Sequence, residues 1–145
     1  MNDPITIRHL STADYEAICE VWAASGLPYK PTGRESREAF TTQMASDVQD
    51  ALGAEIAGEL VGVVLATHDS RKGWINRLAV AKRHQRKGVG RALIEAAEAA
   101  LRAKGLTVIA ALVEHYNEAS FALFQAAGFH VHETYYLSKR DSQDV

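Results

Sequence analysis

The residues best suited to chemistry gather in one basic stretch of the chain, residues 71–94. This stretch holds eight of the sixteen Lys and Arg residues and contains no Asp or Glu. At its centre lies the sequence QRKGVG, residues 85–90, between a strand-like run and an Ala-rich helical run. A glycine turn that opens a helix aims several backbone N–H groups and the positive end of the helix dipole at one point. The pattern therefore predicts a site for a multiply phosphorylated ligand, with added charge from Arg86, Lys87 and Arg91.

Elements on both sides of this turn must hold it in place, and the apolar pattern predicts them. Residues 74–80 read as a strand, and residues 89–104 read as a helix that buries Leu93, Ala97 and Leu101. Further strands are predicted at residues 5–8, 54–56, 60–67, 107–113 and 131–137. Further helices are predicted at residues 11–26, 40–48 and 117–127. This order predicts a mixed sheet with helices on both faces, and the apolar strand 107–113 is expected to be buried on both of its faces.

Two ordered blocks of the chain carry a resemblance to a known family. The first reads Gln85-x-x-Gly88-x-Gly90 after a central strand. The second reads Asn-Glu-Ala-Ser at residues 117–120, then Leu-Phe at 123–124 and Gly-Phe at 128–129. Together they resemble the GNAT superfamily of acyl-CoA-dependent N-acyltransferases, whose signatures are Gln/Arg-x-x-Gly-x-Gly/Ala and Asn-x-x-Ala…Tyr…Gly-Phe. The resemblance implies an α/β fold in one domain, residues 1–145. Its central sheet would be mixed and mostly antiparallel, with helices on both faces and the fourth and fifth strands splayed apart.

The resemblance also implies acetyl-CoA as co-substrate, with its pyrophosphate on the glycine turn and its pantetheine arm in the wedge between the splayed strands. Glycine suits Gly88 and Gly90 because a side chain there would block the turn or the approach of the ligand to the backbone. No metal is implied. The cofactor-binding residues expected from the resemblance are Leu78, Ala79, Val80, Gln85, Arg86, Lys87, Gly88, Val89, Gly90, Arg91, Asn117 and Phe124.

Proton handling is where the sequence departs from the family pattern. The positions that often carry a Glu or His near the start of the fourth strand are Trp74 and Asn76 here, and neither is a base. The frequent Tyr general acid falls on Phe124, which has no hydroxyl group. We therefore expect Glu114 and Tyr116 to be the catalytic residues. Glu114 is predicted to lie partly enclosed at the end of the fifth strand, on the same face as Leu112, or else to be only a solvated strand end.

Neighbours of these candidates offer further possibilities. His115 is an alternative proton acceptor beside Glu114 and Tyr116. Arg34, which follows a proline-containing loop, could contact the acceptor or could belong to a helix cap. His130 and His132 would share one strand face, as in a metal site, but no further ligand is near them in the sequence.

Composition excludes several other classes of protein. The net charge of −2 argues against general nucleic-acid binding. The chain shows no signal peptide and no apolar run approaching ~20 residues, so we expect no membrane association. The single cysteine, Cys19, cannot form an internal disulfide, which favours a cytoplasmic location.

The sequence as a whole predicts an N-acetyltransferase that moves the acetyl group of acetyl-CoA directly to a primary amine of a small molecule or a protein N-terminus. The alternative is a non-catalytic acyl-CoA-binding or regulatory module, since the usual Tyr and the acid of the fourth strand are missing. Members of the family are commonly dimers, so a homodimer is possible.

Overall fold

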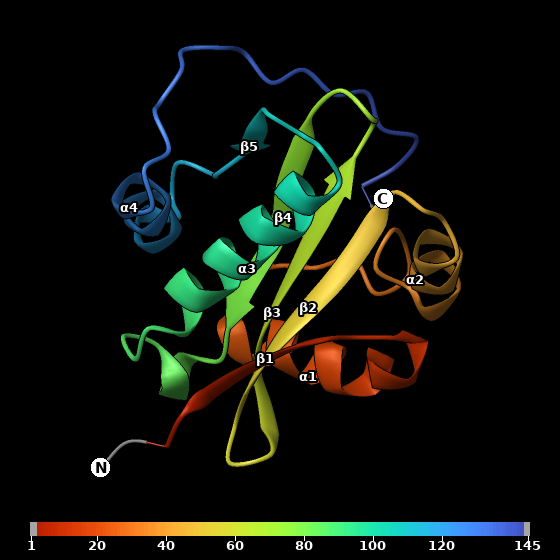
Figure 1. Cartoon of the computed structure of the whole chain (residues 1–145). Helices are drawn as coiled ribbons and strands as arrows, with labels where there is room; N and C mark the ends of the chain where they lie inside the picture. The colour runs from red at the N-terminus through yellow and green to blue at the C-terminus, as the bar shows by residue number, and fades with distance from the viewer. Residues whose placement is uncertain (1–2, 144–145) are drawn as a thin grey trace.

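The computed structural model describes residues 3–143, which form a five-stranded sheet in the order β1-β2-β3-β4-β5 (Figure 1). The first three pairings are antiparallel and the β4–β5 pairing is parallel, which confirms the mixed, mostly antiparallel sheet. The strands are β1 (Ile5–His9), β2 (Gln49–Ile56), β3 (Glu59–His68), β4 (Gly73–Val80) and β5 (Ile109–Ala111).

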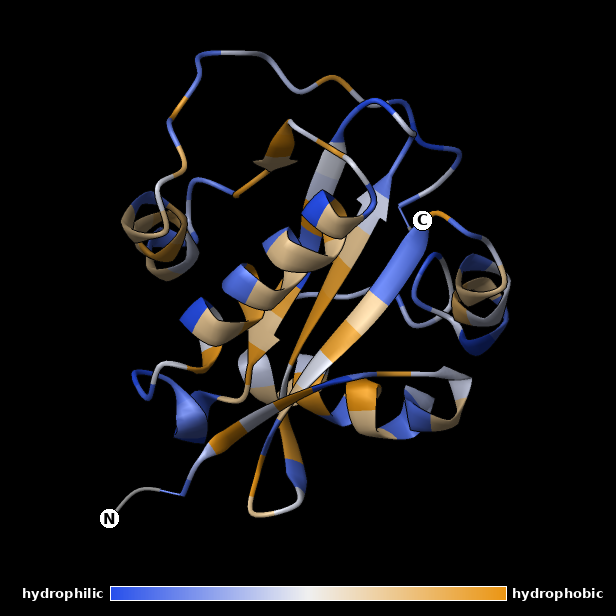
Figure 2. Ribbon diagram, viewed as in Figure 1, coloured by the Kyte–Doolittle hydropathy of each residue, from blue (hydrophilic) through white to orange (hydrophobic). Residues whose placement is uncertain are grey.

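Helices cover both faces of the sheet, as predicted. They are α1 (Tyr15–Ser25), α2 (Arg37–Met44), α3 (Val89–Ala103) and α4 (Glu118–Ala126), with short 3₁₀ turns η1 (Thr12–Asp14) and η2 (Lys82–His84). Side chains alternate between the two faces of a strand, so β3 contributes to two cores. Val64 and Ala66 pack toward α3, whereas Val63 and Leu65 pack toward α1 and α2. Figure 2 shows the apolar run of the central strands between the helices.

Helix α3 is positioned from both of its ends. Gly88 begins it with a left-handed conformation (φ 88°), and Gly105 follows its last turn with φ 89°. In between, Leu93, Ala97 and Leu101 are fully buried against the sheet. The predicted helix and its buried face are thereby confirmed, and the helix ends one residue earlier than expected.

The prediction of the last two strands, residues 107–113 and 131–137, was partly wrong. Strand β5 spans only three residues, and Val108 and Leu112 beside it are 49% and 59% exposed, so the expected burial on both faces is absent. The predicted strand 131–137 is not a strand, and this segment is exposed. Its β-branched and aromatic residues favour a strand only where a partner strand accepts them, and the segment does not pair with β5.

Residues 129–143 instead cross the molecule as an irregular segment, here called the C-terminal segment. It runs from α4 over the end of the sheet to the loop between α1 and α2 (Figure 1). There the Nζ of Lys30 donates to the backbone oxygen of Gln143 over 2.6 Å. Other boundaries moved as well, because β2 begins at Gln49 and α2 ends at Met44, which leaves Val48 outside the helix and 43% exposed.

Strands β4 and β5 diverge soon after they begin. Only residues 73–75 of β4 pair with β5, so residues 76–80 have no partner strand on that edge within the described residues. On the other edge, Val63 pairs with Ala79 and Leu65 with Asn76, so Arg77 and Leu78 together lie opposite one residue of β3. This is a β-bulge, which bends a strand and re-aims its side chains. The predicted splaying of the fourth and fifth strands is therefore confirmed.

Candidate functional site

The turn before α3 presents a set of free backbone donors. Within the described part of the chain, none of the N–H groups of residues 86–91 has a hydrogen-bond acceptor. Arg86 and Gly88 both adopt positive φ angles, 64° and 88°, which turn consecutive peptide groups toward one side. Successive N–H groups arranged in this way, at the start of a helix of fifteen residues, form a cradle for an anion.

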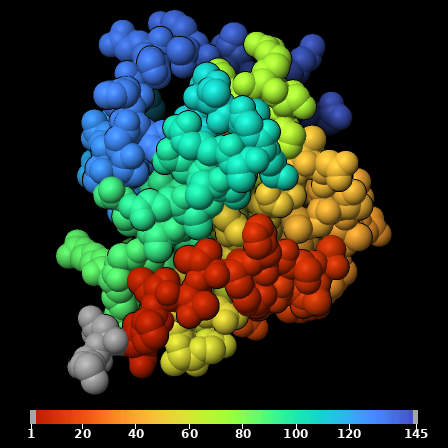
Figure 3. All heavy atoms as spheres, in the orientation of Figure 1, coloured from red at the N-terminus to blue at the C-terminus, as the bar shows by residue number. Residues whose placement is uncertain are grey.

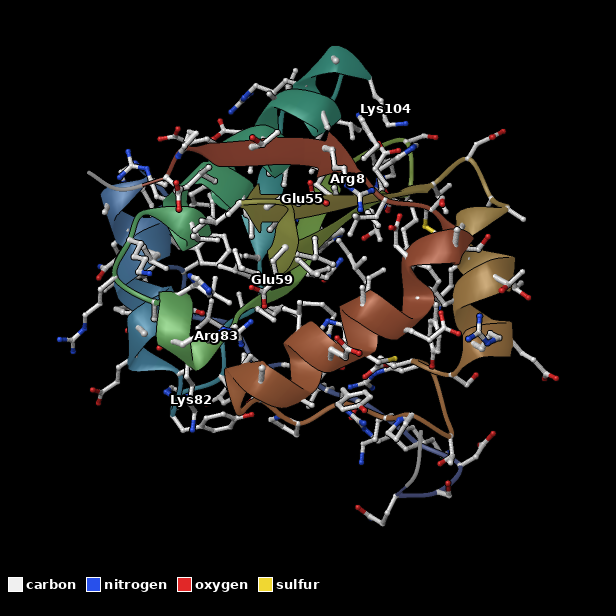
Figure 4. All side chains as sticks on the ribbon, turned by 90° about the horizontal axis from the view of Figure 1, so that it is seen from below. Arg8, Glu55, Glu59, Lys82, Arg83 and Lys104 are labelled. Carbon is white, nitrogen blue, oxygen red and sulfur yellow. The ribbon has the colours of Figure 1, made fainter. Side chains whose placement is uncertain are left out.

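Basic side chains surround this turn, but they are not all free. Arg86 and Lys87 are exposed, whereas Nε of Arg91 is bound to the Glu95 carboxylate over 2.8 Å. Arg83, one turn earlier, is paired with Glu59 across the β2–β3 turn (Figure 4). The basic side chains most available to bind a phosphate are therefore Arg86 and Lys87.

His84 lies on the same side of the turn as Lys87. Its Nδ1 lies 3.3 Å from the Lys87 Nζ, and partial burial, then Lys87 and Arg83, lower its pKa. A neutral imidazole nitrogen can accept a hydrogen bond from the Lys87 ammonium, so His84 positions Lys87 without competing for an anion.

The two glycines of the motif have different tasks. A Cβ atom on Gly88 would meet only Ile5 Cδ1, at 4.0 Å, so the positive φ angle and not crowding requires glycine there. A Cβ atom on Gly90 would lie 2.7 Å from Leu123 Cδ1. Gly90 is buried between α3 and α4, so its missing side chain serves helix packing. The expectation that Gly90 also leaves room for the ligand at the backbone stays a prediction.

The free edge of β4 offers a second set of backbone groups next to the turn. Ala81 donates its N–H to the Val61 oxygen on β3 over 2.9 Å, so its neighbour Val80 faces the opposite edge. The Val80 oxygen accepts instead from Nε2 of Gln85 over 3.1 Å. The same alternation turns Leu78 outward and Ala79 toward β3. Leu78 and Val80 therefore offer backbone groups to the wedge, and Gln85 ties the strand to the turn.

A cleft of about 1620 Å³ opens beside this edge. It lies between β4, β5, α4, the loop that joins α1 to α2, and the C-terminal segment. Figure 3 shows the surface hollowed between the C-terminal segment and the end of α3. The wall residues that the argument below uses are Trp22, Arg34, Glu35, Arg77, Glu114 and Phe124.

Asn117 and Phe124 lie on the α4 side of the wedge. Asn117 caps α4, because its Oδ1 accepts from the Ser120 N–H over 3.2 Å, and its side-chain amide hydrogens stay available. Phe124 is 7% exposed and packs edge-on against Phe129, with ring centroids 5.2 Å apart. The aromatic ring therefore belongs to the core behind the cleft and also forms part of its wall.

Glu114 lies beyond the strand at whose carboxyl end it was expected. β5 ends at Ala111, so Glu114 and Tyr116 belong to the following loop, and Glu114 shares no strand face with Leu112. Glu114 is exposed and not partly enclosed as expected, although it lines the cleft together with His115. Tyr116 is 66% exposed and is not part of the cleft wall. The short β5 explains both corrections, because the chain leaves the sheet before it reaches these residues.

Sequence reasoning missed Arg77, which lies in the β4 bulge with φ 53°. Its guanidinium stacks on Trp22, with Cζ 5.1 Å from the ring centroid, and Nη1 donates to the Pro28 oxygen over 2.8 Å. Burial lowers the pKa of Arg77, and the nearby Glu35 opposes this effect. A charged residue inside a mainly apolar strand was the available signal.

Glu35 was also missed as a buried residue. It is 5% exposed, accepts the Lys30 backbone N–H over 2.9 Å and lies 3.1 Å from Nε of Arg34. Ser36 then caps α2 by accepting from the Ala39 N–H over 3.1 Å. Capping in this loop therefore belongs to Ser36, and Arg34 is left to pair with Glu35 at the edge of the cleft.

Two further searches concern only residues 3–143. They contain no group of three or more His, Cys, Asp or Glu residues that could hold a metal ion, and His130 and His132 are on no strand. No helix among them has the length and the apolar character needed to cross a membrane.

Comparisons with known proteins agree with this arrangement. The model of the acetyltransferase (GNAT) family matches residues 11–129. The PaiA N-acetyltransferase of Thermoplasma acidophilum, solved with coenzyme A, has a TM-score of 0.80 and 24% identity, and the match covers 90% of this chain and 92% of that chain.

Two other solved structures have the same fold at 17% identity. The aminoglycoside N-acetyltransferase AAC(6')-Iy, bound to a bisubstrate analogue, has a TM-score of 0.80 and is matched over 96% of this chain and 99% of its own. The ribosomal-protein-alanine N-acetyltransferase of Brucella melitensis has a TM-score of 0.75, over 94% and 99% of the two chains.

The family match spans most of the chain and includes β4, the turn at residues 85–91 and the cap of α4. It confirms the interpretation of the sequence as an acetyl-CoA-dependent N-acetyltransferase, and it does not favour the non-catalytic alternative. The chain belongs to the acetyltransferase (GNAT) family.

Proposed function

We propose that this protein acetylates a primary amine of a small molecule or of a protein N-terminus by direct transfer from acetyl-CoA. The observation that carries the proposal is that two sets of free backbone groups, one at the turn before α3 and one along the edge of β4, are continuous. The donors of residues 86–91 run into the unpaired edge of β4 through the Gln85–Val80 hydrogen bond. A long polyanion with a polar arm, such as acetyl-CoA, matches this path.

Each part of the path has a task in the proposal. The N–H groups of residues 86–91, with Arg86 and Lys87, hold the pyrophosphate. Leu78 and Val80 bind the pantetheine arm through their backbone, while Ala79 supports them from the β3 side. Asn117 contacts the cofactor with its free amide hydrogens, and Phe124 closes the wedge. The remaining positions, Val89, Gly90 and Arg91, contribute through the first turn of α3.

Catalysis in this proposal depends mainly on position. A backbone N–H of the β4 edge polarises the thioester carbonyl, and one donor aimed at the developing oxyanion is worth about 3 kcal/mol. The amine enters from the cleft and, once it has lost the ammonium proton, attacks the carbonyl carbon. The coenzyme A thiolate then leaves and takes up the proton that the nitrogen loses as the amide forms. Glu114, exposed on the cleft wall, takes the ammonium proton through a water molecule, with Tyr116 nearby. Proximity and orientation supply the larger part of the rate.

The setting of the enzyme is also proposed. A lone cysteine, Cys19, fits a reducing cytoplasm, and a homodimer fits the family. Sedimentation of the purified protein at several concentrations will measure the oligomeric state.

A matched pair of variants tests the phosphate turn. Gly88 and Gly105 stand at opposite ends of α3 with φ 88° and 89°, and neither position is crowded. Acetyl-CoA should raise the thermal midpoint of the wild type, because a ligand that binds the native state stabilises it. Gly88→Asp should abolish the rise by placing negative charge in the cradle, whereas Gly105→Asp, with the same backbone strain, should keep it. An equal rise in both variants would reject this assignment of the turn.

A further inference from the structure

We propose that Arg77 is the specificity residue for the acceptor, and that the acceptor carries a carboxylate close to its reactive amine, as an amino acid does. The inference rests on the proposed function, because it names the substrate class of the same cleft. It starts from the Arg77 guanidinium, which lines the cleft and forms no ion pair with any of residues 3–143.

The charge of Arg77 is not balanced by the described residues. Within residues 3–143, no carboxylate oxygen lies within 4.0 Å of its guanidinium, and its Nε is buried without any hydrogen-bond partner. Only Nη1 has an acceptor, the neutral Pro28 carbonyl. A partly desolvated guanidinium without a partner is costly, and a bidentate carboxylate is the group that its fork of donors fits best.

The nearest acid cannot serve as that partner. The Glu35 carboxylate is held by the Lys30 N–H and by Arg34, at 2.9 Å and 3.1 Å. Arg34 itself lies close enough to Arg77 to help lower the pKa of the Arg77 guanidinium. Two guanidinium groups on one wall thus lie near a single carboxylate, which is paired with Arg34, so this wall of the cleft has an excess positive charge. An anionic group of the acceptor would balance it.

The position of Arg77 relates this charge to the reaction. Arg77 shares the β4 bulge with Leu78, whose backbone faces the wedge in which the thioester is proposed to lie. Its side chain is fixed by stacking on Trp22 of α1, which is 1% exposed. A fixed cation at Arg77, next to the residue that faces the proposed thioester, suits an acceptor whose carboxylate and amine are only a few bonds apart. It disfavours a polycationic acceptor.

Pairs of acceptors that differ only in charge test the inference. We would assay L-amino acids and β-alanine against their own carboxamides, with spermidine as a polycation. The wild type should acetylate at least one acid with a kcat/KM at least ~10-fold above that of its amide. Arg77→Gln should bring this ratio close to one by lowering kcat/KM for the acid, while kcat/KM for the amide stays within ~3-fold of the wild-type value. Arg77→Lys should keep part of the preference.

The control is Arg102→Gln, since Arg102 also lines the cleft but is paired with Glu98 over 2.9 Å. This variant should keep the wild-type ratio, and the thermal midpoints of all variants show whether they fold. A purely structural Arg77 would lower the rates with acid and amide alike and leave their ratio unchanged, which would overturn the proposal. Faster acetylation of spermidine than of every acid would overturn it as well.

A binding measurement keeps the inference testable without turnover. Saturation-transfer NMR with the protein saturated with coenzyme A should detect at least one amino acid from a pool, and should lose that signal in Arg77→Gln. Coenzyme A binding together with amino acid binding, but no transfer to any amine, would contradict the proposed function alone. Absence of any amino acid signal, or equal signals from acids and amides, would contradict the role of Arg77.

Discussion

Gly90 in α3 and Leu123 in α4 lie so close together that a Cβ atom on Gly90 would be 2.7 Å from Leu123 Cδ1. This contact fixes α4, and with it Asn117 and Phe124, against the start of α3. Gly90, which belongs to the family motif at the turn before α3, thus also holds the far wall of the wedge. A change there should act on stability and on the site together.

A double-mutant cycle tests this contact. Gly90→Ala gains about 1 kcal/mol of helix propensity but loses about 1–3 kcal/mol through overpacking. We expect a net loss in the wild-type background and a gain in the Leu123→Ala background, where the added methyl group has room. Chemical denaturation of the four proteins gives the coupling energy, expected to be about 1–2 kcal/mol. Additive effects would show that α4 moves freely away from α3.

The second prediction concerns the missing general acid. The coenzyme A thiol has a pKa near that of a free cysteine, about 8.5, so its thiolate leaves with little help. Phe124→Tyr should therefore change kcat by less than ~10-fold. Phe129→Tyr, in the same ring pair, is the control for adding a hydroxyl group to this core. A gain approaching ~10²-fold in Phe124→Tyr alone would mean that the natural enzyme lacks an acid it needs.

The third prediction concerns the proton acceptor. Glu114→Gln should lower kcat roughly 10²-fold near neutral pH and leave acetyl-CoA affinity unchanged. The loss should shrink as the pH rises, because more of the acceptor amine then arrives neutral. Glu118→Gln is the matched control, since Glu118 is another exposed acid on the same cleft. A pH–rate profile of Glu114→Gln that matches the wild type would move the role to His115 or Tyr116.

The fourth prediction concerns the stability of the first strand and helix. Arg8 lies between two carboxylates, with Nη2 2.9 Å from Asp14 Oδ1 and Nε 2.8 Å from Glu55 Oε2. Figure 4 shows Arg8 beside Glu55. Asp14 also accepts the Ser11 N–H over 2.8 Å and completes a capping box. The hydrogen bond from Arg8, and then that from Ser11, lower the pKa of Asp14.

A carboxylate whose pKa is lower in the folded state stabilises the fold above its unfolded pKa, about 3.9, and this stabilisation disappears as the pH falls through the folded value. Asp14→Asn should therefore lower the free energy of unfolding by about 1 kcal/mol at pH 7. The difference should vanish in strong acid. Denaturant titrations from pH 7 to pH 2 measure it, and a constant difference over this range would contradict the assignment.

The sequence by itself determined the glycine turn before helix α3, the helix itself and the family. These features are local, because a glycine with positive φ, the helical spacing of Leu93, Ala97 and Leu101, and an asparagine cap need only their neighbours along the chain.

Only the tertiary structure decided the cleft. Residues 131–137 could form a strand only by pairing with the edge of β5, and they do not pair with it. Strand β5 also ends at Ala111, so Glu114 and Tyr116 lie in an exposed loop. The β4 bulge depends on its register with β3, and this register turns Arg77 toward Trp22, far away in the sequence. Burial, pairing and charge balance at these residues arise from contacts between distant segments, and no spacing within the chain specifies such contacts.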